Sequence, residues 1–209
     1  MAQIGKIEKP ATEQFKEKRK VYLVPLIYSS EGAPTEYKEK CHLYWQQVAD
    51  QLNNLETKIG RVNRVYHETI SLSGKDGMKF VEKLNSDSYQ IAKSKCDNGA
   101  SFEAIEDNEL FQEAMDWERC FSVGFMSEKV TRKVFEFYVE ASTKRYEFMA
   151  KKITETLKDN EAGLLFIGEE HRLQFPSDIE VFSVFPPALD EIHRWLRDHV
   201  KIKEEEVKD

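Results

Sequence analysis

The amino-acid sequence predicts an α/β domain with a parallel-core sheet flanked by helices and a helical insertion between the second and third strands. Two continuous apolar runs, 21–28 and 163–167, have the length and composition of strands covered on both faces. Between them, apolar residues recur at helical spacing. Strand and helix patterns that alternate in this order are typical of parallel β-α-β units.

The first half of the chain supplies a flexible arm, two strands and the helix between them. Residues 1–19 are polar and contain Pro10, so we expect an arm, followed by a single α/β domain over 20–200. The run 21–28 predicts the first strand, with pairing on one side ending near Pro25, which lacks an N–H donor. Apolar residues at three- and four-residue steps predict a helix over 37–59, and 61–70 predicts the second strand.

The second half is mainly helical. Residues 73–92 predict a helix that is broken near 85–88, and the acidic stretch 102–117 also has an apolar side typical of a helix. Ser127 is expected to cap a helix of roughly thirty residues, on the order of 45 Å long. A strand at 163–167, another at 179–185, a helix that begins near Pro187 and a charged tail over 201–209 complete the chain.

Charge and composition exclude several function classes. The formal net charge is −7 and basic residues form no long stripe, which argues against nucleic-acid binding. The three cysteines are widely separated, so we expect reduced thiols and a cytoplasmic protein. The run 21–28 is too short to cross a membrane. The sequence contains none of the common phosphate-loop, dinucleotide, nucleophile-elbow or H-E-x-x-H signatures.

Polar residues follow two of the predicted strands. Glu68 comes after the second strand, and His171 comes after the strand that begins at Gly163. If the strands are parallel neighbours, a carboxylate and an imidazole meet at one edge of the sheet, where α/β folds bind ligands. Such a pair suits a divalent metal ion or a general base. The alternative is that His67, Glu68, Glu169 and Glu170 are solvated loop residues. Because neighbouring strand residues point to opposite faces, His67 and Glu68 should not serve the same site.

Arg145 lies on the apolar line of the long helix, with Ala141 and Phe148. A buried arginine needs a carboxylate partner, and Glu68 is one candidate. The alternative places its head in water at the edge of the helix.

Two further groups of residues have a functional and a structural interpretation. The acidic stretch 103–118 contains carboxylates that suit a metal, but such density is usually a solvated helix face. Phe182, Phe185 and Trp195 would make an aromatic ligand platform, but we expect them to pack in the core.

Three short motifs resemble the TraB/Tiki and ChaN/erythromycin-esterase-like group. They are Tyr66-His-Glu-Thr69, Lys144-Arg-Tyr-Glu-Phe-Met-Ala150 and Gly168-Glu-Glu-His171. The resemblance covers about half of the chain and implies a parallel-sheet domain with its site at the strand ends. It also implies hydrolase activity, metal-dependent in some members. The group carries a further histidine after the first strand, where this sequence has Pro25-Leu-Ile-Tyr28.

The leading hypothesis is therefore a hydrolase-like domain. Glu68 and His171 would bind a divalent metal ion or activate water, and Arg145 would position Glu68 or an anionic group of a small-molecule or peptide ligand. The alternative is a non-enzymatic binding or regulatory domain that has lost the catalytic histidine pair. A third hypothesis is an interaction module that dimerises through its long helix. We expect no nucleic-acid or membrane partner.

Overall fold

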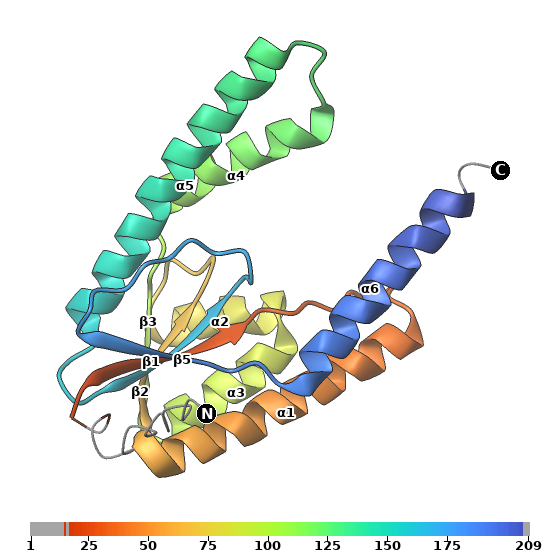
Figure 1. Ribbon diagram of the computed structural model, residues 1–209. Coiled ribbons are helices and arrows are strands. Elements are labelled where there is room, and N and C mark those ends of the chain that lie inside the picture. The colour runs from red at the N-terminus through yellow and green to blue at the C-terminus, as the bar shows by residue number, and fades with distance from the viewer. Residues whose placement is uncertain (1–14, 16, 207–209) are drawn as a thin grey trace, which may run out of the picture.

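Five parallel strands form one sheet in the order β3-β2-β4-β1-β5 (Figure 1). This computed structural model describes residue 15 and residues 17–206. The strands are β1 (Arg19–Pro25), β2 (Val62–His67), β3 (Ser101–Glu103), β4 (Ala162–Ile167) and β5 (Ile179–Ser183). Since all of them run in the same direction, their carboxyl ends meet at one edge of the sheet.

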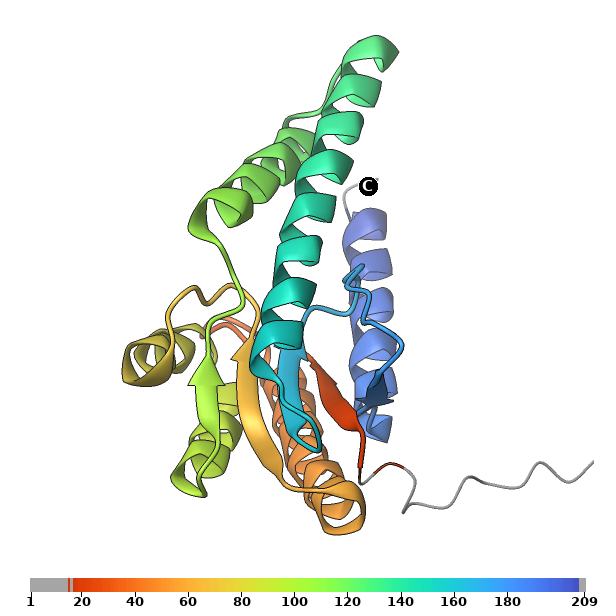
Figure 2. The same cartoon turned by 90° about the vertical axis from the view of Figure 1, so that its left-hand side faces the viewer.

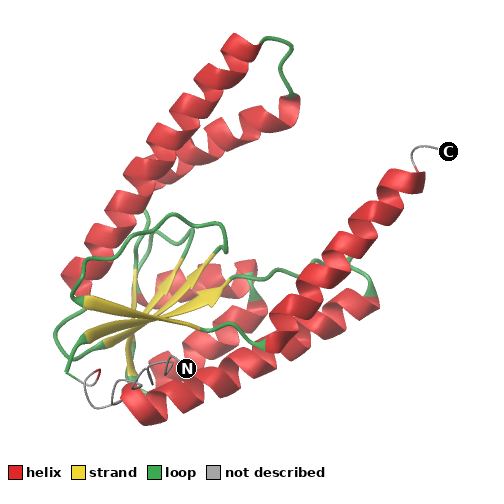
Figure 3. Cartoon of the chain, viewed as in Figure 1, coloured by secondary structure: helices red, strands yellow, loops and turns green. Residues whose placement is uncertain are grey.

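Helices connect most of the strands and flank the sheet (Figure 3). Their bounds are α1 (Thr35–Ile59), α2 (Gly74–Leu84), α3 (Ser86–Asp97), α4 (Asn108–Val123), α5 (Glu128–Thr156) and α6 (Pro187–Glu206). The expected break near 85–88 is confirmed at Asn85, whose side chain accepts a hydrogen bond from the N–H of Ser88 at the start of α3. The predicted α/β class, with helices inserted after the second strand, is confirmed.

The strands are covered on both faces, as their apolar runs predict. Along β1, Tyr22 and Val24 belong to the larger core cluster, which includes residues of α1, α3 and α6. Val21 and Leu23 point to the other face and join a second cluster that includes Met149 of α5. This alternation places α1 and α5 on opposite sides of the sheet (Figure 2).

Pairing of β1 differs on its two sides. With β5 the paired residues end at Leu23, whereas with β4 they continue to Pro25, opposite Ile167. The prediction that pairing on one side stops near Pro25 is confirmed, because proline has no N–H to donate to a second neighbour.

Strand β3 was not predicted. It has only three residues, pairs with β2 alone and lies within the stretch expected to be mainly helical, where α4 begins only at Asn108. The short edge strand is too brief to give a period-two pattern, but it adds a third strand end to the edge that carries Glu68.

Helices α4 and α5 form an antiparallel pair that projects beyond the sheet (Figures 1 and 2). Only the second half of α5 packs on the sheet, through Met149, Ile153 and Leu157 just after it. Neither core cluster contains a described residue from 106 to 145. The helical insertion is therefore an extension of the domain and not a further layer on the sheet.

The expected arm and tail are only partly described. Residues 1–14, 16 and 207–209 lie outside the described residues, while Phe15 contacts Phe182 edge to face at 5.4 Å and Arg19 already begins β1. At the other end, α6 continues through Glu206, into the stretch expected to be a tail. In the described part of the chain, no helix has the length and apolar character needed to span a membrane.

The aromatic residues near the C-terminus differ in their packing. Phe182 and Trp195 are half-buried, and Trp195 contacts Tyr37 with ring centroids 4.9 Å apart. Phe185 is 58% exposed, so the prediction that it packs in the core is wrong. It follows the end of β5, where the chain turns toward α6 and no helix covers it. All three cysteines are free, and Cys41 is buried.

Candidate functional site

Glu68 and Arg145 meet at the carboxyl edge of the sheet. Arg145 lies on the buried face of α5, and its Nη2 donates to Oε1 of Glu68 across 3.0 Å. Its side chain is only 6% exposed. A buried guanidinium must be paired, and the helical position of Arg145 predicted both its burial and this partner.

Gly168 fixes the other oxygen of the same carboxylate. The residue follows β4, which lies beside β2, and its N–H donates to Oε2 of Glu68 at 2.7 Å. The N–H of Glu68 in turn donates to the carbonyl of Phe166 at 2.9 Å, which continues the ladder past the end of β2. The carboxylate therefore bridges the ends of two neighbouring strands.

A second carboxylate, Glu106, shares the guanidinium. Nε of Arg145 lies 3.2 Å and 3.0 Å from the two Glu106 oxygens, and Nη2 also donates to Glu106. The N–H of Thr69 donates to Oε1 of Glu106 at 3.0 Å. The Glu106 side chain is 1% exposed, so the expectation of a solvated acidic face is wrong for this residue.

The sequence did offer one indication of Glu106. It follows Ile105, which is fully buried, and comes three residues after β3 rather than within a helix. Its carboxylate therefore comes from the third strand end at the same edge. The argument that had placed Glu68 there would also have placed Glu106, had the three-residue strand been recognised.

The charges of this cluster do not cancel. Burial disfavours the charged form of Arg145, but hydrogen bonds from Glu106 and the charges of Glu106 and Glu68 outweigh burial and raise its pKa. The guanidinium therefore stays protonated. One positive charge faces two carboxylates, so a negative charge remains at the strand ends if both are ionised.

His171 lies in the loop after β4, close enough to Glu68 for their charges to interact. Burial lowers the pKa of His171, and the charge of Glu68 opposes the shift. The N–H of Leu173 donates to Nδ1 of His171 at 3.3 Å. That bond leaves the proton of the neutral ring on Nε2, so the ring can donate a hydrogen bond from Nε2 but offers no free lone pair there.

The donor atoms at this edge do not fit a divalent metal ion held by Glu68 and His171. Each Glu68 oxygen already accepts a hydrogen bond, and Nδ1 of His171 is an acceptor from the backbone. Within residue 15 and residues 17–206, no group of three or more His, Cys, Asp or Glu side chains has the arrangement of a metal site. Binding would require several of these bonds to break first.

Two tyrosines and a hollow adjoin the cluster. Burial, followed by the charge of Glu68, raises the pKa of Tyr28 to about 12 and that of Tyr146 to about 12, so both phenols are protonated donors. A hollow of about 280 Å³ lies between α5 and the loop after β4. It is lined by Thr143, Tyr146, Glu147, Ala150, Arg172 and Gln174.

The other polar residues near these strands serve different roles. His67 is fully buried and not solvated; its ring faces away from Glu68, with Nε2 3.2 Å from Oγ of Ser88. Its separation from the Glu68 site agrees with the alternation of strand side chains. Glu169 is exposed and contacts His193 of α6 at 2.9 Å, and Glu170 is exposed. The solvated interpretation is thus correct for these two glutamates and wrong for His67.

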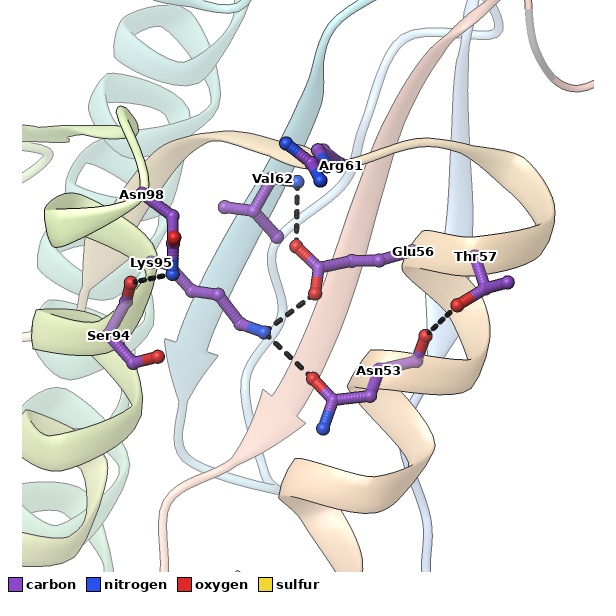
Figure 4. Close-up of a pocket in the computed structure, with 8 residues that line it drawn as sticks. All are labelled: Asn53, Glu56, Thr57, Arg61, Val62, Ser94, Lys95 and Asn98. Atoms are coloured by element: carbon purple, nitrogen blue, oxygen red, sulfur yellow. Dashed lines mark hydrogen bonds and ion pairs between the residues drawn. The ribbon is translucent and has the colours of Figure 1, made fainter.

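A larger hollow of about 560 Å³ lies at the opposite, amino end of β2 (Figure 4). There Nζ of Lys95 donates to Glu56 at 2.6 Å and to Asn53 at 3.2 Å, and the N–H of Val62 donates to Glu56 at 3.0 Å. These groups satisfy one another and join α1, α3 and β2. We therefore assign them to the packing of the elements and not to a site.

Comparison with protein-family models, curated proteins and solved structures found no match to this chain. The resemblance to the TraB/Tiki and ChaN/erythromycin-esterase-like group consequently stays a prediction carried by its three short motifs.

Proposed function

We propose that the strand-end cluster is a water-activating, hydrolase-like site in which Glu68 accepts a proton from the attacking water. The observation that carries this proposal is the position of the Glu68 carboxylate, bound by Arg145 and by the N–H of Gly168 at the edge where three parallel strands end. Open α/β sheets bind their ligands at this edge.

The surrounding groups support the same chemistry. Two carboxylates share one guanidinium, so the cluster keeps the capacity to accept a proton. Nε2–H of neutral His171 and the phenol of Tyr146 are donors of the kind that stabilise negative charge on an oxygen as water attacks a carbonyl carbon. Arg172 and Tyr146 line the adjoining hollow, which suits a small-molecule or peptide ligand with an anionic group. The proposal needs no metal ion, and it includes a cytoplasmic location and no nucleic-acid partner.

A second candidate is a binding or regulatory domain without catalysis. The observation that favours it is that both Glu68 oxygens and both Glu106 oxygens already accept hydrogen bonds within the protein. Such a network also serves as a clasp between β2, β4 and α5.

Hydrolysis of a panel of chromogenic esters and amides by the full chain separates the two candidates. We expect wild-type turnover to fall by at least about 100-fold in Glu68→Gln, the size of a lost general base. Glu170→Gln, in the exposed loop nearby, is the matched control and should keep full turnover. Circular dichroism would verify that both variants fold. Wild type without turnover on any member of the panel would favour the binding domain.

The metal question needs its own arm. We expect turnover and the melting temperature to be unchanged by a chelator and by added Zn²⁺, Mn²⁺ or Mg²⁺. Turnover that requires one of these ions would contradict the metal-free proposal and restore the expectation that Glu68 and His171 are ligands.

A further inference from the structure

The projecting helix pair exposes apolar side chains out of proportion to its length. We call α4, the turn at 124–127 and the first half of α5 the arm, residues 108–140. Within α4 only Ala114 is buried, and between residues 128 and 140 of α5 only Val134 is buried. The large apolar residues of the arm that are at least 38% exposed are Phe121, Val123, Met126, Val130, Phe135 and Phe137. Helices in soluble proteins normally bury such side chains against another layer.

From this surface we infer that the arm is a self-association site, in which the arms of two copies of this chain pack antiparallel into a four-helix bundle. Its sequence supplies two helices with apolar side chains, and a bundle needs four such helices to enclose a core. Near the tip, a hollow of about 440 Å³ lined by Phe121, Phe125, Met126 and Phe135 is open to receive a partner's side chains.

Charge along the arm selects a second copy as the occupant. Helix α4 has four acidic residues and one basic residue, and Glu109 and Glu113 lie near the base of the arm. The tip of the arm at the start of α5 carries Lys129, Arg132 and Lys133 against Glu128. Of these bases, Lys129 and Arg132 have no ion-pair partner among the described residues, whereas Lys133 contacts Glu136 at 2.5 Å.

Antiparallel packing brings these opposite charges together. Trp117 and Phe137 stack at 4.8 Å near the middle of the arm, while Phe111 contacts Arg145 at its base. A two-fold axis through the middle would place Arg132 of one copy near Glu113 of the other. Symmetry repeats the same contact on the other side, so one chain supplies both halves of the interface. The net charge of −7 and the acidic side of the arm disfavour an anionic lipid surface.

Light scattering and sedimentation of the full chain test this inference. We expect a monomer–dimer equilibrium between about 1 and about 100 µM, since association depends on concentration. Phe135→Asp should weaken association at least tenfold, by about 1.4 kcal/mol or more. Phe80→Asp, an equally exposed site on α2, is the matched control and should leave it unchanged.

A charge exchange tests the orientation. Arg132→Glu should weaken the dimer, and Glu113→Lys added to Arg132→Glu should restore it, because each interface contains the pair twice. Circular dichroism of each variant would exclude loss of fold. A wild type that stays monomeric throughout the range, or a monomer that binds phosphatidylcholine or phosphatidylserine vesicles through Phe135, would overturn the inference. Failure of the exchange to restore a weakened dimer would overturn the antiparallel arrangement.

Discussion

The N–H of Gly168 lies 2.7 Å from Oε2 of Glu68, so residues that follow two neighbouring strands are joined directly, one hundred positions apart in the chain. A Cβ atom at Gly168 would lie 3.3 Å from that oxygen, tighter than an ordinary contact. The oxygen cannot move away without losing a bond to the backbone. The pair therefore links the shape of the sheet edge to the position of the carboxylate.

Gly168→Ala should lower the free energy of unfolding by about 1 kcal/mol, because the new methyl group displaces a carboxylate that is bonded on both oxygens. Urea denaturation measures the change. Gly32→Ala is the control, since a Cβ there meets nothing within 4 Å. Equal stability of the two variants would show that Glu68 adapts freely.

Arg145→Met should lower the free energy of unfolding by about 3–5 kcal/mol, because it leaves the two carboxylates buried without their cation. Lys144→Met, the neighbouring position on α5, removes an exposed pair with Glu140 and should change stability little. Thermal and urea unfolding of both variants would provide the comparison. A loss no larger than that of the lysine variant would mean that water reaches the cluster.

Thr69→Gly should raise the free energy of unfolding by about 1 kcal/mol. The backbone of Thr69 has a φ of 72°, which is costly for a β-branched residue, and its buried hydroxyl has no partner. Gly74→Ala is the reciprocal control: at a φ of 61° with open space around it, the added methyl group should destabilise. If Thr69→Gly were destabilising, the threonine side chain would have a packing role that outweighs its strain.

His67 should make the protein less stable in acid. Burial lowers its folded-state pKa to about 4 from the usual 6.5, so the folded state binds fewer protons than the unfolded state between these values. Its contribution is fully present above pH 6.5 and is lost as pH falls, by about 3 kcal/mol near pH 4. Urea unfolding from pH 8 to pH 4 should show a shallower decline for His67→Gln than for wild type. His42→Gln, exposed on α1, should follow wild type.

The sequence predicted the parts of this site that lie on long, regular elements. The helical line through Ala141 and Phe148 placed Arg145 on a buried face, and the apolar runs placed Glu68 and His171 after adjacent strands. Glu106 was missed because its strand is three residues long and its neighbours are acidic, so the local pattern indicated a solvated helix. His67 was assigned to a loop because the end of β2 depends on tertiary pairing with β4 and not on local composition.

The central place of β4 has a consequence for how the chain is made. Its residues 162–167 separate β1 from β2, although both of those strands lie more than ninety residues earlier. A nascent chain that ends before residue 162 therefore holds β1 and β2 with no strand to join them, and its apolar faces must wait. Most of the protein has to leave the ribosome before this sheet can close, and contacts between such distant segments form slowly.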